Sequence, residues 1–173
     1  MALLIRPAQA GDLRACLRLN DACVPEMGAA SAAFFDAWLD RAFAFRVAER
    51  DGAFAGFVLG MDPAADYDSP NFRFFQARYE HFVYVDRIAV PPEHRGAGVG
   101  KALYRDLAGL VRGRGGAPRI TCEVNLRPRN QPSLDFHARL GFLEVGRQQV
   151  GEKEVSLLAW ELGTGEQEAG IGD

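Results

Sequence analysis

The sequence has 173 residues, of which 48% are hydrophobic and 25% charged, a balance that suits one globular domain and excludes overall disorder. Its formal net charge of −3 gives no general electrostatic reason to expect a nucleic-acid or membrane partner. The opening apolar run is too short for a signal peptide, and no stretch is long enough to span a bilayer, so we expect a cytoplasmic protein. The scattered cysteines and histidines lack metal-ligand spacing, so we expect no metal site.

The first half of the chain is predicted to contain a strand, two helices and a hairpin. Asp12 is a candidate cap for the first helix, and Ser31 for a second helix whose aromatic residues share one face. Asp51-Gly52 tolerates positive φ and predicts a tight hairpin turn. The polar segment 62–71 is predicted to be a loop, and the aromatic and basic residues of 72–80 support no assignment. The predicted strands are 5–8, 45–49 and 54–59.

The second half has a clearer pattern. Its predicted elements are a strand at 81–90, a helix at 98–112, a strand at 119–125, a helix at 132–140, and hairpin strands at 142–150 and 154–162. Strands alternate with helices in the middle of the chain and hairpins lie at either end, which predicts a mixed α/β (α+β) sheet. We expect residues 1–162 to form one domain and the Gly- and Glu-rich residues 163–173 to form a disordered tail.

A glycine-rich loop at 95–100 joins a predicted strand to a predicted helix. Glycines let the backbone approach a ligand, and the free N–H groups and dipole of a helix start favour negative charge, so the loop predicts an anion site. A magnesium-nucleotide P-loop is excluded, because Arg95 stands where its first glycine is required and Ala102 replaces its Ser or Thr. A dinucleotide fingerprint starting at Gly96 fails at Lys101. A turn that only joined a strand to a helix would need fewer glycine and polar residues than this segment contains.

Two motifs carry a resemblance to a known family. Arg95, Gly98 and Gly100 occupy the defined positions of Gln/Arg-x-x-Gly-x-Gly/Ala, the pyrophosphate-binding motif of the GNAT superfamily of N-acetyltransferases. About thirty residues later, 130–142 is similar to the second motif of the family, Asn-x-x-Ala/Ser-x-x-Phe/Leu-Tyr-x-x-x-Gly-Phe. Together, in this order and with one strand between them, the motifs make residues 82–162 resemble a GNAT acetyltransferase.

The resemblance implies a fold and a co-substrate. The fold would be a mostly antiparallel central sheet flanked by helices and splayed between the strands at 82–90 and 119–125. The co-substrate would be acetyl-CoA, used without a metal ion, and a homodimer would fit the family. Asn130 could equally cap a helix. The residues that the resemblance assigns to the cofactor are Ile88, Ala89, Val90, Arg95, Gly96, Ala97, Gly98, Val99, Gly100, Lys101, Asn125, Asn130, Ser133 and Phe136.

Direct transfer of acetyl to an amine needs a neutral amine and a proton for the departing thiolate. In the family a tyrosine of the second motif usually supplies that proton, and His137 stands in its place. An imidazole can protonate a thiolate, so His137 is the candidate acid, although it could merely pack beside the cofactor, and Tyr104 is an alternative donor. Asp86 and Glu123 are the candidate bases, and Asp86 could equally form a structural ion pair with Arg87.

The sequence therefore predicts an acetyl-CoA-dependent N-acetyltransferase that acts on a primary amine of a small molecule, a peptide or a protein. The alternative is a catalytically weak acyl-CoA-binding sensor or partner module of the same fold, which the change from tyrosine to histidine leaves open. The acceptor cleft is expected near 21–31, 62–71 and 148–153. The acidic residues of the first two segments suit a cationic amine.

Overall fold

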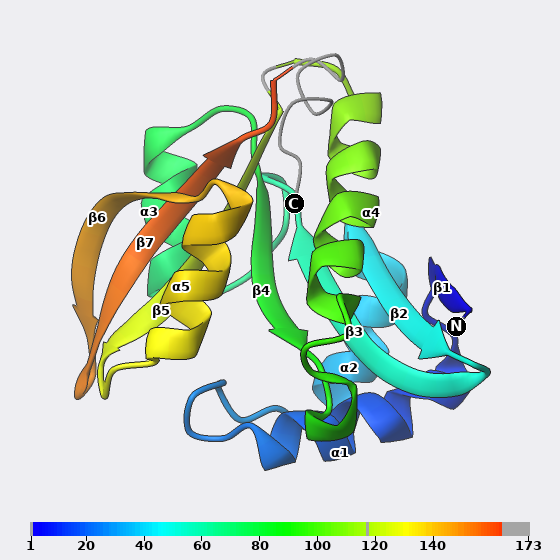
Figure 1. Ribbon diagram of the computed structural model, residues 1–173. Coiled ribbons are helices and arrows are strands. Elements are labelled where there is room, and N and C mark those ends of the chain that lie inside the picture. The colour runs from blue at the N-terminus through cyan, green and yellow to red at the C-terminus, as the bar shows by residue number, and fades with distance from the viewer. Residues whose placement is uncertain (1, 117, 164–173) are drawn as a thin grey trace. The chain divides into compact units, whose positions relative to one another are not determined.

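The computed structural model describes residues 2–116 and 118–163 (Figure 1). Its strands follow the order β1-β2-β3-β4-β5-β7-β6. The described chain divides into two compact units, an N-terminal unit of residues 2–66 and 85–107 and a C-terminal unit of the remaining residues. Of the predicted tail, only Gly163 falls within the described residues, so the expectation of disorder there lies outside them.

The N-terminal unit consists of an antiparallel sheet with helices on both of its faces. On one face Phe35 of α2 packs against Phe45 and Phe57, with ring centroids 6.1 and 5.6 Å away. On the other face Arg46 forms an ion pair of 2.8 Å with Asp106 of α4. The elements are β1 (Leu3–Pro7), η1 (Ala10–Asp12), α1 (Leu13–Ala22), α2 (Ala32–Arg41), β2 (Ala44–Arg50), β3 (Ala53–Met61), the part of β4 (Val83–Ala89) from residue 85, η2 (Pro92–His94), and α4 (Val99–Gly113) up to residue 107.

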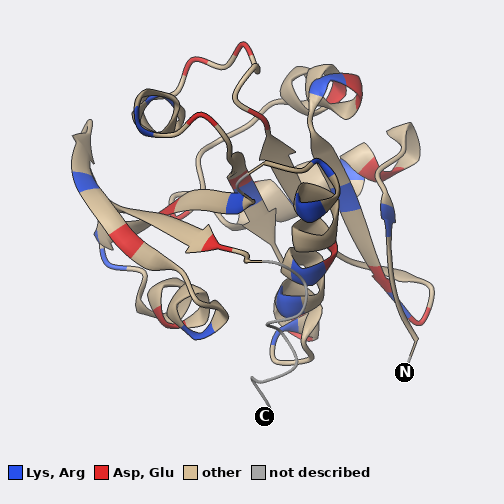
Figure 2. Ribbon diagram, turned by 90° about the horizontal axis from the view of Figure 1, so that it is seen from above, with Lys and Arg blue, Asp and Glu red and all other residues tan. Residues whose placement is uncertain are grey.

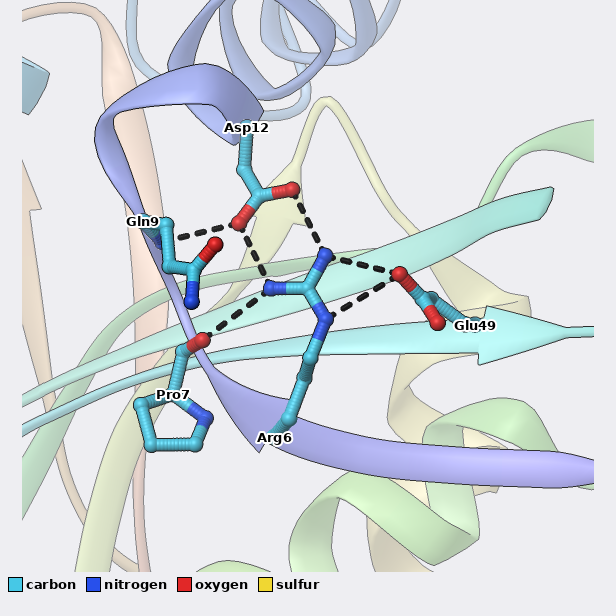
Figure 3. Close-up of polar contacts among 5 residues, drawn as sticks. All are labelled: Arg6, Pro7, Gln9, Asp12 and Glu49. Atoms are coloured by element: carbon cyan, nitrogen blue, oxygen red, sulfur yellow. Dashed lines mark hydrogen bonds and ion pairs between the residues drawn. The ribbon is translucent and has the colours of Figure 1, made fainter. Parts of the chain in front are cut away.

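The predicted cap of the first helix proves to have a different role. Asp12 stands at the start of α1, but its side chain makes no capping hydrogen bond to that helix. Instead Arg6 donates to both carboxylate oxygens of Asp12 at 2.7 and 2.8 Å and also to Glu49 (Figure 3). The backbone N–H of Gln9 donates to Asp12 as well, at 2.8 Å. The Arg6 guanidinium lowers the pKa of Asp12, and the cluster ties β1, β2 and η1 together.

Two other local signals act as the sequence predicts. Ser31 accepts a hydrogen bond of 3.0 Å from the backbone N–H of Phe34 and so caps α2. Asp51 and Gly52 have φ values of 52° and 83°, the left-handed conformation that the tight turn between β2 and β3 requires. Capping and turn chemistry therefore define the borders of these elements.

The C-terminal unit is built on the antiparallel order β5-β7-β6, with helix α5 on one face and α3 on the other (Figure 1). The start of β4 pairs with β5 in parallel, Val83 opposite Ile120 and Tyr84 opposite Thr121. The expected splaying of β4 from β5 further along the strands stays a prediction. The other elements are α3 (Pro70–Arg78), β5 (Arg119–Arg127), α5 (Gln131–Leu140), β6 (Leu143–Val150) and β7 (Lys153–Glu161).

Helix α3 occupies most of the segment that supports no assignment from the sequence, and its first residues fall in the predicted loop. Ser69 accepts a hydrogen bond from the N–H of Phe72, and Pro70 occupies the first helical position, where its missing N–H costs nothing. Phe72 and Phe75 are fully buried. The helix therefore forms because a capped start is combined with aromatic residues one turn apart, buried on the sheet.

The mixed α/β fold class predicted from the sequence is confirmed, and the sheet is mostly antiparallel. None of the helices in the described residues is both long enough and apolar enough to cross a membrane.

Candidate active site

The glycine loop of the N-terminal unit presents its backbone to solvent. Gly96 and Gly98 have φ values of +77° and +82°, which disfavour any side chain. No atom lies within 4 Å of the point where a Cβ at either glycine would stand, so conformation rather than packing requires glycine here. Residues 95–98 of the loop are exposed, whereas Val99 at the start of α4 is buried and anchors the helix. The loop therefore offers accessible backbone N–H groups at a helix start.

The charges around this loop favour an anion. The Nε of Arg95 donates to the carbonyl oxygen of Val90 at 3.0 Å, which holds the arginine stem across the loop. Lys101 is exposed in the first turn of α4, a turn without acidic residues. A cation at a helix N-terminus is unfavourable unless an anion binds there. Arg105 also lies in α4, and Figure 2 shows how the Lys and Arg residues are distributed over the described chain.

The end of β4, where the sequence places pantetheine contacts, is packed tightly against β3. A Cβ on Gly56 of β3 would lie 2.6 Å from the carbonyl oxygen of Ala89, and Gly56 has a φ of +142°. Ala89 is buried, whereas Ile88 and Val90 are half-buried. Gly56 therefore determines where the last residues of β4 lie. Sequence reasoning missed it, although a glycine inside a strand is a signal of close backbone approach.

Asp86, one of the two candidate bases, forms a buried ion pair. Its Oδ2 lies 2.6 Å from Nε of Arg87, and the side chains are 5% and 7% exposed. Arg87 also donates to Oδ1 of Asn20 at 2.8 Å and to the carbonyl of Gly28 at 3.2 Å, and its guanidinium stacks over Phe34 at 4.5 Å. This network attaches the end of α1 and the segment that follows it to β4. It gives Asp86 the geometry of the structural ion pair that the sequence left open.

Helix α5 begins with the asparagine of the second motif. Asn130 accepts a hydrogen bond of 3.3 Å from the N–H of Ser133, so Asn130 does cap the helix, and its backbone N–H donates to the carbonyl of Asn125 at 3.0 Å. Nδ1 of His137 lies 2.7 Å from the carbonyl oxygen of Ser133, one turn earlier. Because a carbonyl can only accept, Nδ1 carries the proton and Nε2 carries a lone pair.

The buried His137 ring is held by aromatic side chains. It packs edge-on against Phe136 and Phe142, with ring centroids at 5.2 and 5.1 Å, and Phe142 in turn contacts Trp160. Gly141 has a φ of +114°, and a Cβ there would lie 3.0 Å from Trp160. His137 is 4% exposed, and burial lowers its pKa, so the neutral ring dominates at neutral pH.

Glu123, the other candidate base, is positioned by a tyrosine. The hydroxyl of Tyr84 donates to Oε2 of Glu123 at 2.7 Å. Tyr84 is 1% exposed and lies against Phe72 and Phe75 of α3, with ring centroids at 5.6 and 5.9 Å. Helix α3 therefore packs against Tyr84, and Tyr84 in turn orients the carboxylate of Glu123. Sequence reasoning did not single out Tyr84, because α3 was not expected.

Tyr104, the alternative donor, and the cysteines have surroundings that suit structural roles. Tyr104 is fully buried within α4. Burial raises the pKa of Cys16 to about 12, and it also raises the pKa of Cys23 despite the nearby Arg95. In the part of the chain that the structure describes, no three His, Cys, Asp or Glu side chains cluster as metal ligands would.

The predicted cofactor residues belong to two groups. Residues 88–101 lie in the N-terminal unit, and Asn125, Asn130, Ser133 and Phe136 lie in the C-terminal unit together with His137 and Glu123. Within the C-terminal unit, hydrogen bonds link Asn130, Ser133 and His137 over two successive turns of α5, while Glu123 bonds to Tyr84 on the face that α3 covers.

Comparison with known proteins adds independent findings. The model of the acetyltransferase (GNAT) family matches residues 13–142. The ribosomal-protein-S18-alanine N-acetyltransferase of Escherichia coli superposes with a TM-score of 0.70 at 18% identity, covering 93% of this chain and 94% of that one. YncA of Salmonella typhimurium, solved with its cofactor acetyl-CoA, gives 0.69 at 20% identity, covering 94% and 95%. A glucosamine 6-phosphate N-acetyltransferase of Trypanosoma brucei brucei is 35% identical over 65 residues, 38% of this chain and 40% of that relative.

Proposed function

Because the chain belongs to the acetyltransferase (GNAT) family, we propose that it transfers the acetyl group of acetyl-CoA directly to a primary amine. The observation that carries the proposal is the loop 95–100, exposed at 95–98, whose glycine conformations and helix start favour a bound anion. The pyrophosphate of CoA is such an anion. Arg95 and Lys101 supply the positive charge that would complement it.

The thioester arm would follow the end of β4. An extended strand offers backbone N–H and C=O groups to a pantetheine chain, which contains two amide groups of its own. Ile88, Ala89 and Val90 are therefore the residues assigned to this arm, and Gly56 determines where their backbone lies. Asn125, Asn130, Ser133 and Phe136, all in the C-terminal unit, keep the cofactor role that the family resemblance implies.

His137 would handle the proton of the reaction. The sequence suggests a proton donor to the departing thiolate, but the neutral ring with its proton on Nδ1 first has to accept one at Nε2. We therefore assign His137 a relay role: Nε2 takes a proton released as the amine becomes an amide, and the resulting imidazolium returns a proton to the CoA thiolate. Proton number then balances over the turnover.

Of the two carboxylates, Glu123 is the better candidate for activating the amine. Its orientation is fixed by the hydroxyl of the buried Tyr84, whereas Asp86 is engaged in the ion pair with Arg87. A carboxylate can accept a proton from an ammonium ion, either directly or through water. Asp86 would instead keep the network around Arg87 in place.

The identity of the acceptor can be tested with amines of several classes. The relative from Trypanosoma brucei brucei is named for glucosamine 6-phosphate, but the match spans about two fifths of its length. The acidic side chains expected along 21–31 and 62–71 suit a cationic amine. A first panel would contain glucosamine 6-phosphate, free amino acids, polyamines and short peptides with a free N-terminus.

The first experiment is calorimetric titration of the purified protein with acetyl-CoA, beside Arg95→Ala and Gly98→Glu. We expect micromolar binding that both variants weaken at least tenfold, since each removes a favourable group or fills the anion site. Gly115→Glu is a matched control: Gly115 has a φ of +77° and open surroundings, but it lies outside the loop.

The panel of amines, read out by release of the CoA thiol, then separates an enzyme from a sensor. Turnover with an amine supports the proposed reaction. Tight binding of acetyl-CoA without turnover of any amine would favour the sensor alternative. A folded protein that binds no acetyl-CoA would overturn the proposal.

A further inference from the structure

Helix α5 ends in a stop motif, residues 137–142, that includes His137 itself. The N–H of Phe142 donates to the carbonyl oxygen of His137 at 3.0 Å, and the N–H of Gly141 donates to that of Ala138 at 3.1 Å. With Gly141 in the left-handed conformation, these two bonds make a Schellman motif. Such a motif frequently brings its first and last side chains into contact, and here the rings of His137 and Phe142 have centroids 5.1 Å apart. The end of the helix therefore holds both the backbone and the ring of His137.

The strand that follows the stop motif places a tryptophan beside Phe142. Leu143 of β6 is opposite Ala159 of β7. The same register, carried one residue further, sets Phe142 opposite Trp160, and their ring centroids are 5.5 Å apart. Trp160 also lies against the turn itself, because a Cβ on Gly141 would stand 3.0 Å from its Nε1. Trp160 therefore supports two residues of the stop motif at once.

The orientation of the His137 ring determines which of its nitrogens can accept a proton. Nδ1 lies 2.7 Å from the carbonyl oxygen of Ser133, and this contact keeps the proton on Nδ1 and the lone pair on Nε2. Phe136 contacts the ring from within the helix, and Phe142 contacts it from beyond the stop. A ring that turns away from Ser133 loses the hydrogen bond that selects the tautomer. The support of Phe142 therefore bears on the tautomer of His137.

We propose that Trp160 is a positioning residue for proton transfer at His137. By supporting Gly141 and Phe142 it keeps the imidazole on the Ser133 carbonyl, so that Nε2 is the nitrogen that accepts and returns the proton. The proposal rests on the proposed function, in which His137 relays protons. Trp160 acts through Phe142 and exchanges no proton itself, because its indole N–H is a donor only.

The first measurement is the nitrogen NMR spectrum of the histidine rings, which distinguishes a protonated ring nitrogen from an unprotonated one. The sequence has three histidines, and the signals of His137 are those that His137→Gln removes. At neutral pH we expect the wild type to carry a proton on Nδ1 and none on Nε2. Trp160→Leu keeps part of the volume but loses the flat ring, and we expect it to show both tautomers. Trp160→Phe keeps an aromatic ring against Phe142 and should restore the wild-type spectrum.

Kinetics then connect the tautomer to the reaction. With the most rapidly acetylated amine of the panel, Trp160→Leu should lower kcat about fivefold, because the tautomer with its proton on Nε2 cannot accept another there. Its affinity for acetyl-CoA, measured by calorimetry, should stay within about twofold of the wild type. Gly141→Ala disturbs the same contact from the helix side and should act in the same direction. Trp38→Leu is the matched control: Trp38 is a buried tryptophan of α2, and its loss should leave the tautomer of His137 unchanged.

A wild-type spectrum without a proton on Nδ1 of His137, or an unchanged spectrum in Trp160→Leu, would overturn the proposal. A mixture of tautomers with unchanged kcat would overturn it as well, and so would a loss of kcat matched by an equal loss of acetyl-CoA affinity. If Trp160→Leu does not fold, Gly141→Ala decides by the same criteria. A folded wild type that binds no acetyl-CoA would instead contradict the proposed function, and with it the relay on which the role of Trp160 rests.

Discussion

The two units of the molecule build their candidate functional groups in different ways. In the N-terminal unit the groups are parts of the backbone: the glycine loop, the start of α4 and the end of β4 offer N–H and C=O groups in one continuous segment. In the C-terminal unit they are side chains from elements far apart in the sequence. Tyr84 and Glu123, for example, are 39 residues apart. A backbone site tolerates changes of side chain but not of conformation, whereas a side-chain site has the opposite sensitivity.

The largest effect is expected from His137→Gln, which would test the side-chain site. Glutamine can still donate to the carbonyl of Ser133 but cannot relay a proton, so kcat should fall about 100-fold while acetyl-CoA affinity holds. In the wild type the acidic limb of the kcat profile should follow His137, whose lowered pKa keeps the ring neutral down to pH values below about 6.5. An alkaline limb that disappears with His137→Gln would show instead that the ring must begin protonated.

Gly56→Ala would test the backbone site without touching a reactive group. The new methyl would meet the carbonyl of Ala89, so the end of β4 must shift, and acetyl-CoA affinity should fall about tenfold in calorimetry. Gly52 also has a positive φ, of 83°, but has open surroundings, so Gly52→Ala serves as the control for a side chain at a positive-φ glycine without the steric contact. If both variants bind acetyl-CoA as the wild type does, the close approach at Gly56 has no part in the cofactor site.

Tyr84→Phe is expected to have a smaller effect, because it removes one hydrogen bond and keeps the ring between Phe72 and Phe75. Without the donor, Glu123 loses its fixed orientation, and kcat should fall about fivefold, as a hydrogen bond of about 1 kcal/mol implies. If Tyr84→Phe lowers thermal stability but leaves kcat unchanged, Tyr84 contributes to packing and not to catalysis.

The smallest effect concerns the cluster around Arg6, far along the chain from either motif. Asp12→Asn should lower the free energy of unfolding by about 1 kcal/mol at pH 7, measured by urea denaturation. Because Arg6 holds the pKa of Asp12 below its unfolded value of about 3.9, this contribution is complete above that pH. It is lost as the pH falls through the folded pKa. A stability difference that persists at pH 2 would contradict this origin.

The sequence by itself determined the glycine loop, the asparagine-capped helix with His137, most strand positions and the family resemblance, because each depends on neighbouring residues. Turn, cap and dipole chemistry act over a few residues, so they can be read from one segment. The tertiary structure decided which side chains meet. It paired Asp86 with Arg87 and Asn20, placed Tyr84 on Glu123, and brought Asn71 to Gln148 through a helix that the aromatic pattern alone did not reveal. Those contacts depend on strand register and on which face a helix covers, and both arise from packing across the sheet rather than from local sequence.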